Sequence, residues 1–145
     1  MGVEKLLDLT SLEKSVSSLA RAIAVYEDSK TKNGYDMPDL LETLRAGVIQ
    51  NFEFTYELSW KFMKRYIEVA GDAAAIDGVP RRELFRVAAE HGLITEVSVW
   101  FDFHKERNQT SHTYDEETAE MVYERSLDFL KYAKTFMAKL QEKNS

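Results

Sequence analysis

The sequence predicts an all-α fold, a bundle of four main helices with one extra short helix. Apolar residues recur at spacings of three and four, and helix-start and helix-stop signals separate the segments. No stretch alternates apolar and polar residues as a half-buried strand would. Because the predicted connections are short, helices that are neighbours in sequence are expected to be antiparallel. The 145 residues contain no repeat, so we predict a single domain over residues 1–145.

The first two helices have clear start signals. Thr10-Ser11-Leu12-Glu13 has the capping-box form, in which the Thr and Glu side chains each satisfy a free backbone amide. This helix should end at Lys32-Asn33-Gly34. The second helix should carry Pro38 in its first turn and run to Gly71. The first helix has one apolar stripe, formed by Leu12, Val16, Leu19, Ile23 and Tyr26.

The second helix is apolar nearly all round. Phe54 and Leu58 point away from its main apolar face, where a four-helix bundle would leave them hard to cover. We therefore predict a subunit interface here, the alternative being that a loop or short helix of the same chain covers them. A favourable pair four residues apart, Glu57 and Lys61, is expected in the narrow polar strip. The strip consists of Gln50, Glu53, Glu57, Lys61 and Lys64.

The second half of the chain supplies three further helices. A short one begins after Pro80 and ends at His91-Gly92, and its basic cluster is either a solvated face or an anion or RNA contact. The next is capped by Thr95-Glu96, and its Val97, Trp100, Phe101 and Phe103 should pack inward. The last runs from about Glu116 to Gln141 after the start signal Asp115-Glu116-Glu117-Thr118. The basic cluster consists of Arg81, Arg82 and Arg86.

Composition restricts the possible functions. The absence of cysteine excludes a disulfide framework or a thiolate metal site and fits a reducing compartment, so a cytoplasmic location is expected. No apolar run approaches the roughly 18 residues of a membrane span. A net charge of −6 argues against binding nucleic acid through a broad basic face, so any RNA contact must be local. Glu53 and Glu57 stand four apart, but the Glu-x-x-His pattern of di-iron bundles is absent, and neither metal nor cofactor is expected.

One stretch concentrates chemically capable side chains. Residues 107–114 read Arg-Asn-Gln-Thr-Ser-His-Thr-Tyr and lie between two predicted helices, so they should occupy a helix end and the following connection. His112 can transfer protons near neutral pH, and Arg107 can stabilise charge on a phosphorus centre. Asn108 can position a hydroxyl or phosphate oxygen. The residues therefore suit metal-independent phosphodiester cleavage.

A purely structural interpretation of the same stretch is also open. Arg107 would then pair with Glu106 or Asp102. Ser111 and Thr113 would cap helix ends, and His112 would be a satisfied packing residue. His104, three residues before Arg107 on the same face, is either a further cleft candidate, together with Glu57 and Lys61, or a surface histidine.

Two segments resemble a known family. Arg107, His112 and Tyr114 match the R-x4-H-x-Y pattern of HEPN-domain toxins. The segments RNQTSHTYDEETA and GVIQNFEFTYELSWKFMKRYIE are similar to the nucleotidyltransferase substrate-binding proteins within that group. The resemblance covers about residues 12–140. It implies a left-handed up-and-down four-helix bundle that forms homodimers and higher assemblies with a minimal nucleotidyltransferase.

The resemblance implies two alternative functions, and a helical scaffold that serves only for interaction stays open beside them. As a toxin of a toxin–antitoxin pair, the dimer would be a metal-independent ribonuclease with Arg107 and His112 catalytic and Asn108 supporting. Its partner would silence it by adenylylating Tyr114. As a non-catalytic binding module, the dimer would present a nucleotide or substrate cleft to the nucleotidyltransferase, with Arg107, His112 and Tyr114 as recognition residues.

Overall fold

The computed structural model describes residues 7–34 and 36–144, and the regular secondary structure within these ranges is all helix, without a strand. The all-α prediction is therefore confirmed, whereas residues 1–6, 35 and 145 of the predicted domain lie outside the described ranges. The α-helices are α1 (Thr10–Asn33), α2 (Pro38–Val69), α3 (Arg81–Glu90), α4 (Val97–Asn108) and α5 (Glu116–Lys143), with short 3-10 helices η1 (Ala73–Ala75) and η2 (Gln109–His112).

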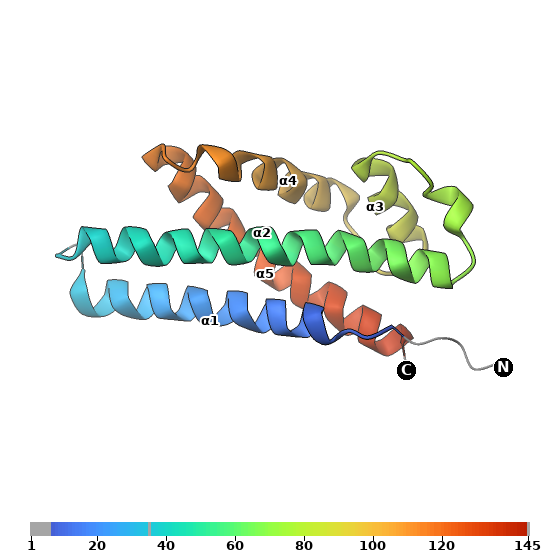
Figure 1. Ribbon diagram of the computed structural model, residues 1–145, viewed down its shortest axis with the longest axis horizontal. Coiled ribbons are helices and arrows are strands. Elements are labelled where there is room, and N and C mark those ends of the chain that lie inside the picture. Colours follow the sequence, from blue (N-terminus) through green and yellow to red (C-terminus); the bar gives the residue numbers. More distant parts are fainter. Residues whose placement is uncertain (1–6, 35, 145) are drawn as a thin grey trace.

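The four longer helices alternate in direction. In Figure 1, α1 and α2 lie side by side along their lengths, α4 runs back along α2, and α5 crosses obliquely behind α2. The short α3 is inserted between α2 and α4. This is the predicted antiparallel order; the left-handedness of the bundle stays a prediction. Leu7 N donates to Asn144 Oδ1 at 2.9 Å and Asn144 Nδ2 donates to the Leu7 carbonyl at 3.0 Å, which ties the end of α5 to the segment before α1.

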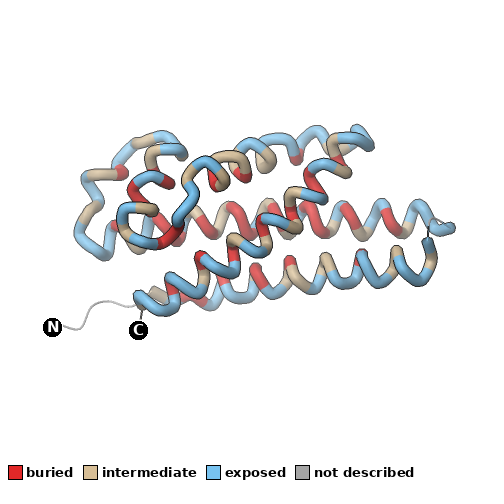
Figure 2. The backbone as a smooth tube through the Cα atoms, turned by 180° about the vertical axis from the view of Figure 1, so that it is seen from behind, coloured by how far each residue is buried: buried red, intermediate tan, exposed pale blue. Residues whose placement is uncertain are grey.

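An aromatic cluster joins α2, α4 and α5 at the centre of the molecule. The ring centroid of Phe129 in α5 lies 5.1 Å from Phe52 of α2, 5.1 Å from Phe103 of α4 and 5.7 Å from Trp100. All three contacts are edge-to-face, the arrangement that aromatic quadrupoles favour. Figure 2 shows the buried positions of each helix facing its neighbours. These rings hold α4, and with it the polar stretch at its end, against the bundle.

Two of the predicted helix caps are wrong and one is confirmed. Thr10 is the first residue of α1 and caps nothing with its side chain; its amide donates instead to Asp8 Oδ1 at 3.0 Å, and hydrogen bonding with Thr10 lowers the pKa of Asp8. Glu96 precedes α4 without a side-chain capping bond. Asp115 does cap α5, because its Oδ2 accepts from the Thr118 amide at 3.0 Å, which keeps the pKa of Asp115 low.

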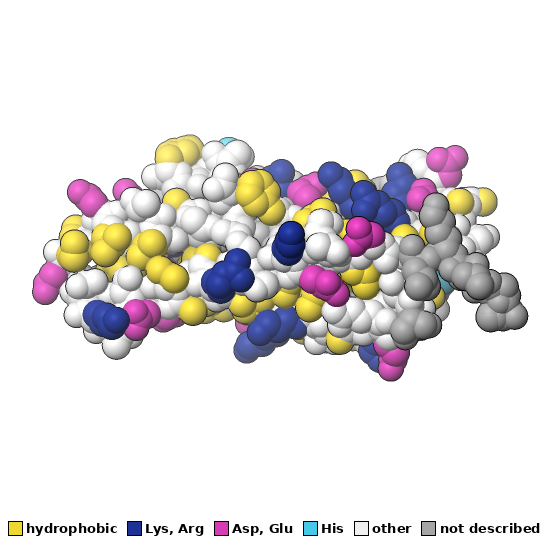
Figure 3. Space-filling view, turned by 60° about the horizontal axis from the view of Figure 1, so that its bottom comes forward, with side chains coloured by type: hydrophobic (Ala, Val, Ile, Leu, Met, Phe, Trp, Pro, Cys, Tyr) yellow, Lys and Arg dark blue, Asp and Glu magenta, His cyan; other side chains and the backbone are white. Residues whose placement is uncertain are grey.

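The outer side of α2 is left partly uncovered. Phe54 is 56% exposed, so the alternative that the same chain covers it is wrong for the described residues. Leu58 is only partly buried and packs against the core. Both line a groove of about 460 Å³ between α1 and α2. Figure 3 shows the face that carries α1, where hydrophobic side chains lie between intermixed acidic and basic ones. Within the described ranges no helix is long and apolar enough to cross a membrane.

Candidate functional site

The polar stretch lies where the sequence predicted it, at a helix end and the connection that follows. Arg107 and Asn108 are the last residues of α4, residues 109–112 form η2, and Tyr114 stands just before the cap of α5. Of these side chains Arg107 is partly buried, whereas Asn108 and His112 are exposed. In the described structure, Arg107 and His112 do not hydrogen-bond to each other.

Arg107 is held by two carboxylates of α2. Its Nε lies 3.2 Å from Glu57 Oε2, and its Nη1 lies 3.3 Å from Glu53 Oε2. Nη1 also donates to Thr110 Oγ1 at 3.2 Å, and that hydroxyl lies 2.9 Å from Glu53 Oε2. The guanidinium therefore connects α4, η2 and α2. The three charged side chains are each about one-third exposed, so the pairs orient Arg107 more than they stabilise the fold.

The structural interpretation of Arg107 named the wrong partners. Glu106 Oε2 and Asp102 Oδ2 face Arg125 of α5 instead, at 3.9 and 4.0 Å. Glu53 and Glu57 stand fifty and more residues before Arg107 in sequence, so only the packing of α4 on α2 identifies them as its partners.

His112 and Tyr114 face outward. Tyr114 is 88% exposed, His112 is also exposed, and their ring centroids are 6.4 Å apart. The interpretation of His112 as a packing residue is therefore wrong. Of Ser111 and Thr113, the two side chains expected to cap in this stretch, Thr113 donates a hydrogen bond to the Thr110 carbonyl at 3.1 Å. An imidazole and a phenol are thus presented to other molecules on a short, anchored segment.

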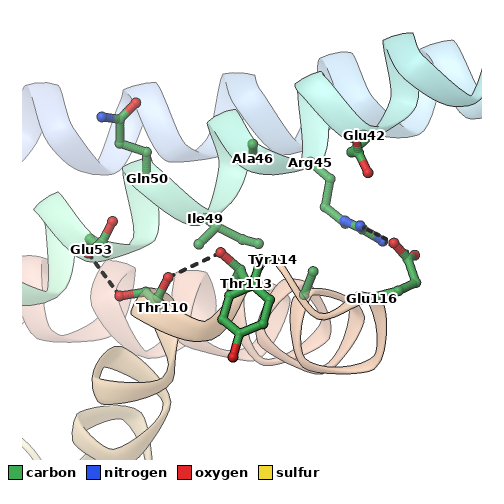
Figure 4. A pocket seen from close by; sticks show the side chains of 11 residues that line it. Glu42, Arg45, Ala46, Ile49, Gln50, Glu53, Thr110, Thr113, Tyr114 and Glu116 are labelled. Carbon is green, nitrogen blue, oxygen red and sulfur yellow. Dashed lines mark hydrogen bonds and ion pairs between the residues drawn. The ribbon is translucent and has the colours of Figure 1, made fainter.

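A pocket of about 670 Å³ lies between α2 and this segment (Figure 4). Glu53 and Thr110 form one side of it, Arg45 and Glu116 the other, and Tyr114 stands at its rim. The complete lining consists of Glu42, Arg45, Ala46, Ile49, Gln50, Glu53, Thr110, Thr113, Tyr114, Glu116 and Ala119.

Arg45 is the pocket residue that the sequence analysis missed. It is only 7% exposed, and its Nη1 and Nη2 donate to the two carboxylate oxygens of Glu116 at 2.6 and 2.8 Å. Nη1 also lies 3.2 Å from Glu120 Oε1. These bonds lower the pKa of Glu116 and fix the start of α5 on α2. Arginine between the apolar positions Leu41 and Val48, on the buried face of a helix, is the sequence signal that marks it.

The cleft candidates are not all placed as expected. His104 Nδ1 lies 2.7 Å from the Tyr56 hydroxyl, and Glu57 accepts from both Arg107 and the Trp60 indole. The predicted Glu57–Lys61 pair does not form between these described side chains; Lys61 Nζ lies 5.8 Å from the Trp60 ring centroid. The described residues contain no group of three or more His, Asp or Glu side chains placed to hold a metal ion.

The three arginines of the basic cluster have different environments. Arg86 is solvated and paired with Glu83 and Glu90, as one interpretation expected. Arg81 lies over the Trp60 ring and Arg82 over the Phe101 ring. Phe101 is only partly buried, contrary to the inward packing predicted for it.

Burial and positive charge act on the His104–Tyr56 pair. Burial, reinforced by the Arg81 guanidinium, lowers the pKa of His104. Burial also raises the pKa of Tyr56 above its usual range. His104 is therefore a neutral partner for the Tyr56 hydroxyl at neutral pH, and the pair is part of the scaffold behind Arg107.

With this geometry in place, the chain can be assigned to a family. The family model described as nucleotidyltransferase substrate binding protein like matches residues 7–142, and the chain belongs to that family. A protein of Haemophilus influenzae named probable ribonuclease HepT is 38% identical over 143 residues, which cover 95% of this chain and 94% of that protein. The family predicted from the two sequence segments is thus confirmed.

Two solved structures have the same fold. A Haemophilus influenzae structure, described as the fold of a substrate binding domain of a nucleotidyltransferase, matches with a TM-score of 0.83 and 36% identity. The match covers 92% of this chain and 99% of that one. A Thermus thermophilus protein matches with a TM-score of 0.67 over 89% of this chain and 98% of its own, but at 24% identity it supports the fold alone.

The lowered pKa of His104 predicts a pH dependence of stability. Because the folded state disfavours the imidazolium, its contribution is full above the unfolded pKa of about 6.5 and is lost as pH falls below that value. The melting temperature of the His104→Gln variant should therefore fall less than that of the wild type between about pH 7 and pH 5. Groups such as Glu106 titrate in both proteins, so the comparison isolates His104. Parallel melting curves for the two proteins would contradict this assignment.

Proposed function

We propose that the protein is the nucleotidyltransferase-associated subunit of a two-protein system and that it cleaves RNA at the end of α4 without a resident metal ion. The observation that carries the proposal is the exposed His112 on the short helix η2 that follows an anchored Arg107, in a chain 38% identical over nearly its whole length to a probable ribonuclease. The family description supports the nucleotidyltransferase association.

The proposed reaction uses the 2′-hydroxyl of RNA as nucleophile. His112 accepts its proton, the 2′-oxygen forms a bond to phosphorus, and the bond from phosphorus to the 5′-oxygen breaks. In the proposed homodimer the motifs of the two copies face each other, and the leaving 5′-oxygen takes a proton from the imidazolium of the second motif. Arg107 stabilises the additional negative charge on the phosphoryl oxygens, and Asn108 positions one of them. To do so, Arg107 must turn part of its guanidinium edge from Glu53 or Glu57 toward the phosphate.

Cleavage of single-stranded RNA by the purified wild type, in the presence of a chelator, is the first expected result. His112→Ala should slow it by about 10²- to 10⁴-fold, since general acid–base catalysis is lost. An RNA with 2′-deoxy sugars throughout is the matched substrate control and should be resistant. Equal rates for wild type and His112→Ala, or cleavage of the deoxy substrate, would exclude this chemistry.

A homodimer would bury the exposed side of α2. Phe54 is more than half exposed and Leu58 is only partly buried, which supports a homodimer interface on this side of α2. Phe54→Glu should therefore shift the protein from dimer to monomer in size-exclusion chromatography with light scattering, because a charge cannot be buried there without a partner. Val69→Glu, at another exposed apolar position of α2, is the control. A dimer unchanged by Phe54→Glu would place the interface elsewhere.

Tyr114 is the proposed site at which the nucleotidyltransferase silences the enzyme. Its phenol is 88% exposed and stands at the rim of the pocket, so its oxygen can attack the α-phosphate of ATP with release of pyrophosphate. Intact-mass measurement after co-expression with a nucleotidyltransferase encoded beside it should detect an adenylyl group. The group should be absent from Tyr114→Phe and from protein expressed alone. An unmodified wild type in a stable complex would contradict the silencing.

The second candidate is a non-catalytic binding module. The pocket of about 670 Å³ beside Tyr114, with the buried Arg45 in its wall, favours this alternative, as does the description of the related structure as a substrate binding domain. In that case Arg107, His112 and Tyr114 recognise a nucleotide or another substrate. RNA cleavage lost in His112→Ala separates the two candidates.

A further inference from the structure

A continuous set of contacts leads from Arg107 across the surface to α3. Glu57 accepts from Arg107 Nε at 3.2 Å and from Trp60 Nε1 at 3.1 Å, so one carboxylate joins the motif to an indole of α2. The Arg81 guanidinium carbon lies 3.5 Å from the Trp60 ring centroid. Beyond it, Arg82 lies over Phe101. We refer to Trp60, Arg81, Arg82 and Phe101 as the arginine–aromatic strip.

Arg82 is an exposed cation that lies over a ring. Its guanidinium carbon lies 4.1 Å from the centroid of Phe101, and Lys105 Nζ lies 5.4 Å from the same ring. Among the described residues Arg82 has no carboxylate partner, although this chain carries 25 acidic residues. Arg86, one turn further along α3, is paired with two of them. Charge is thus neutralised at Arg86 and left available at Arg82.

Arg81 adds a second guanidinium, which is partly buried and hydrogen-bonds the side chain of Tyr56. Its Nε is buried and finds no hydrogen-bond partner among the described residues. The guanidinium carbons of Arg81 and Arg82 lie 3.5 and 4.1 Å from the ring centroids of Trp60 and Phe101, and the N–H donors of a guanidinium lie in its own plane. Such planar, edge-on donors match phosphate oxygens, and their outer faces can stack on a base.

We propose that the arginine–aromatic strip binds single-stranded RNA next to the cleavage site, with phosphates on the arginine edges and bases stacked on the guanidinium and ring faces. This inference rests on the proposed ribonuclease function and extends it to a substrate-binding subsite. The proposal is compatible with the net charge of −6, because the RNA would contact only a local cationic strip. An acidic peptide would pair with the same arginines, but it has no bases to stack on them.

Two variants of one helix test the strip with the same change in charge. The dissociation constant of a labelled single-stranded RNA is measured by fluorescence anisotropy on the His112→Ala background, so that the probe stays intact. Arg82→Ala should weaken binding about five- to tenfold, whereas Arg86→Ala should change it less than about twofold. Phe101→Leu, which keeps the apolar contact but removes the stacking plane, should also weaken binding. Poly-glutamate should compete poorly with the RNA.

Other outcomes would overturn the proposal. Equal effects of Arg82→Ala and Arg86→Ala would mean that RNA responds only to the net charge of the protein. Efficient competition by poly-glutamate would favour an acidic protein partner. Absence of RNA binding would show that the strip is not an RNA subsite. Thermal melting of each variant checks that the fold is kept. If Arg82→Ala cleaves RNA with an unchanged KM, the proposed RNA-binding role of the strip is wrong, while the proposed ribonuclease function is unaffected. If the wild type binds RNA through Arg82 but never cleaves it, the ribonuclease function is wrong and the RNA-binding strip is supported.

Discussion

The Arg107 guanidinium, held by Glu53 and Glu57, is the contact on which the arrangement of the site depends. It fixes the last turn of α4 on the middle of α2, and through Thr110 it fixes η2 as well. Two carboxylates against one guanidinium leave the group with a net negative charge. Arg107 is therefore oriented but electrostatically compensated, and an anion that approaches it competes with carboxylates already in place.

A second anchor fixes the other end of the same segment. The buried Arg45 binds Glu116 with two parallel hydrogen bonds, and Asp115 caps the first turn of α5. Between the two anchors, residues 109–114 need only a single turn of 3-10 helix to connect α4 to α5. This is why His112 and Tyr114 can be exposed and still have a defined position: the backbone that carries them is held at both ends by α2.

Local patterns in the sequence predicted the helices and the position of the motif, because apolar periodicity and the Asp115 start signal depend on residues close in sequence. The same reasoning failed where partners are distant. It assigned Arg107 to carboxylates on its own helix, when the packing of α4 brings it to α2. It counted Phe101 as core because the residue is apolar, although α3 brings an arginine rather than an apolar side chain to that ring. Burial of Arg45 could have been predicted, because the residue lies on an apolar helix face in the sequence pattern.

Glu57 belongs to two surfaces at once. Its carboxylate orients Arg107, and the same residue lines the groove that contains Phe54, about 60° away around α2. A molecule seated in that groove would contact the same side chain that orients Arg107. The α1–α2 groove and the motif thus share one carboxylate, and a change of Glu57 alters both surfaces at once.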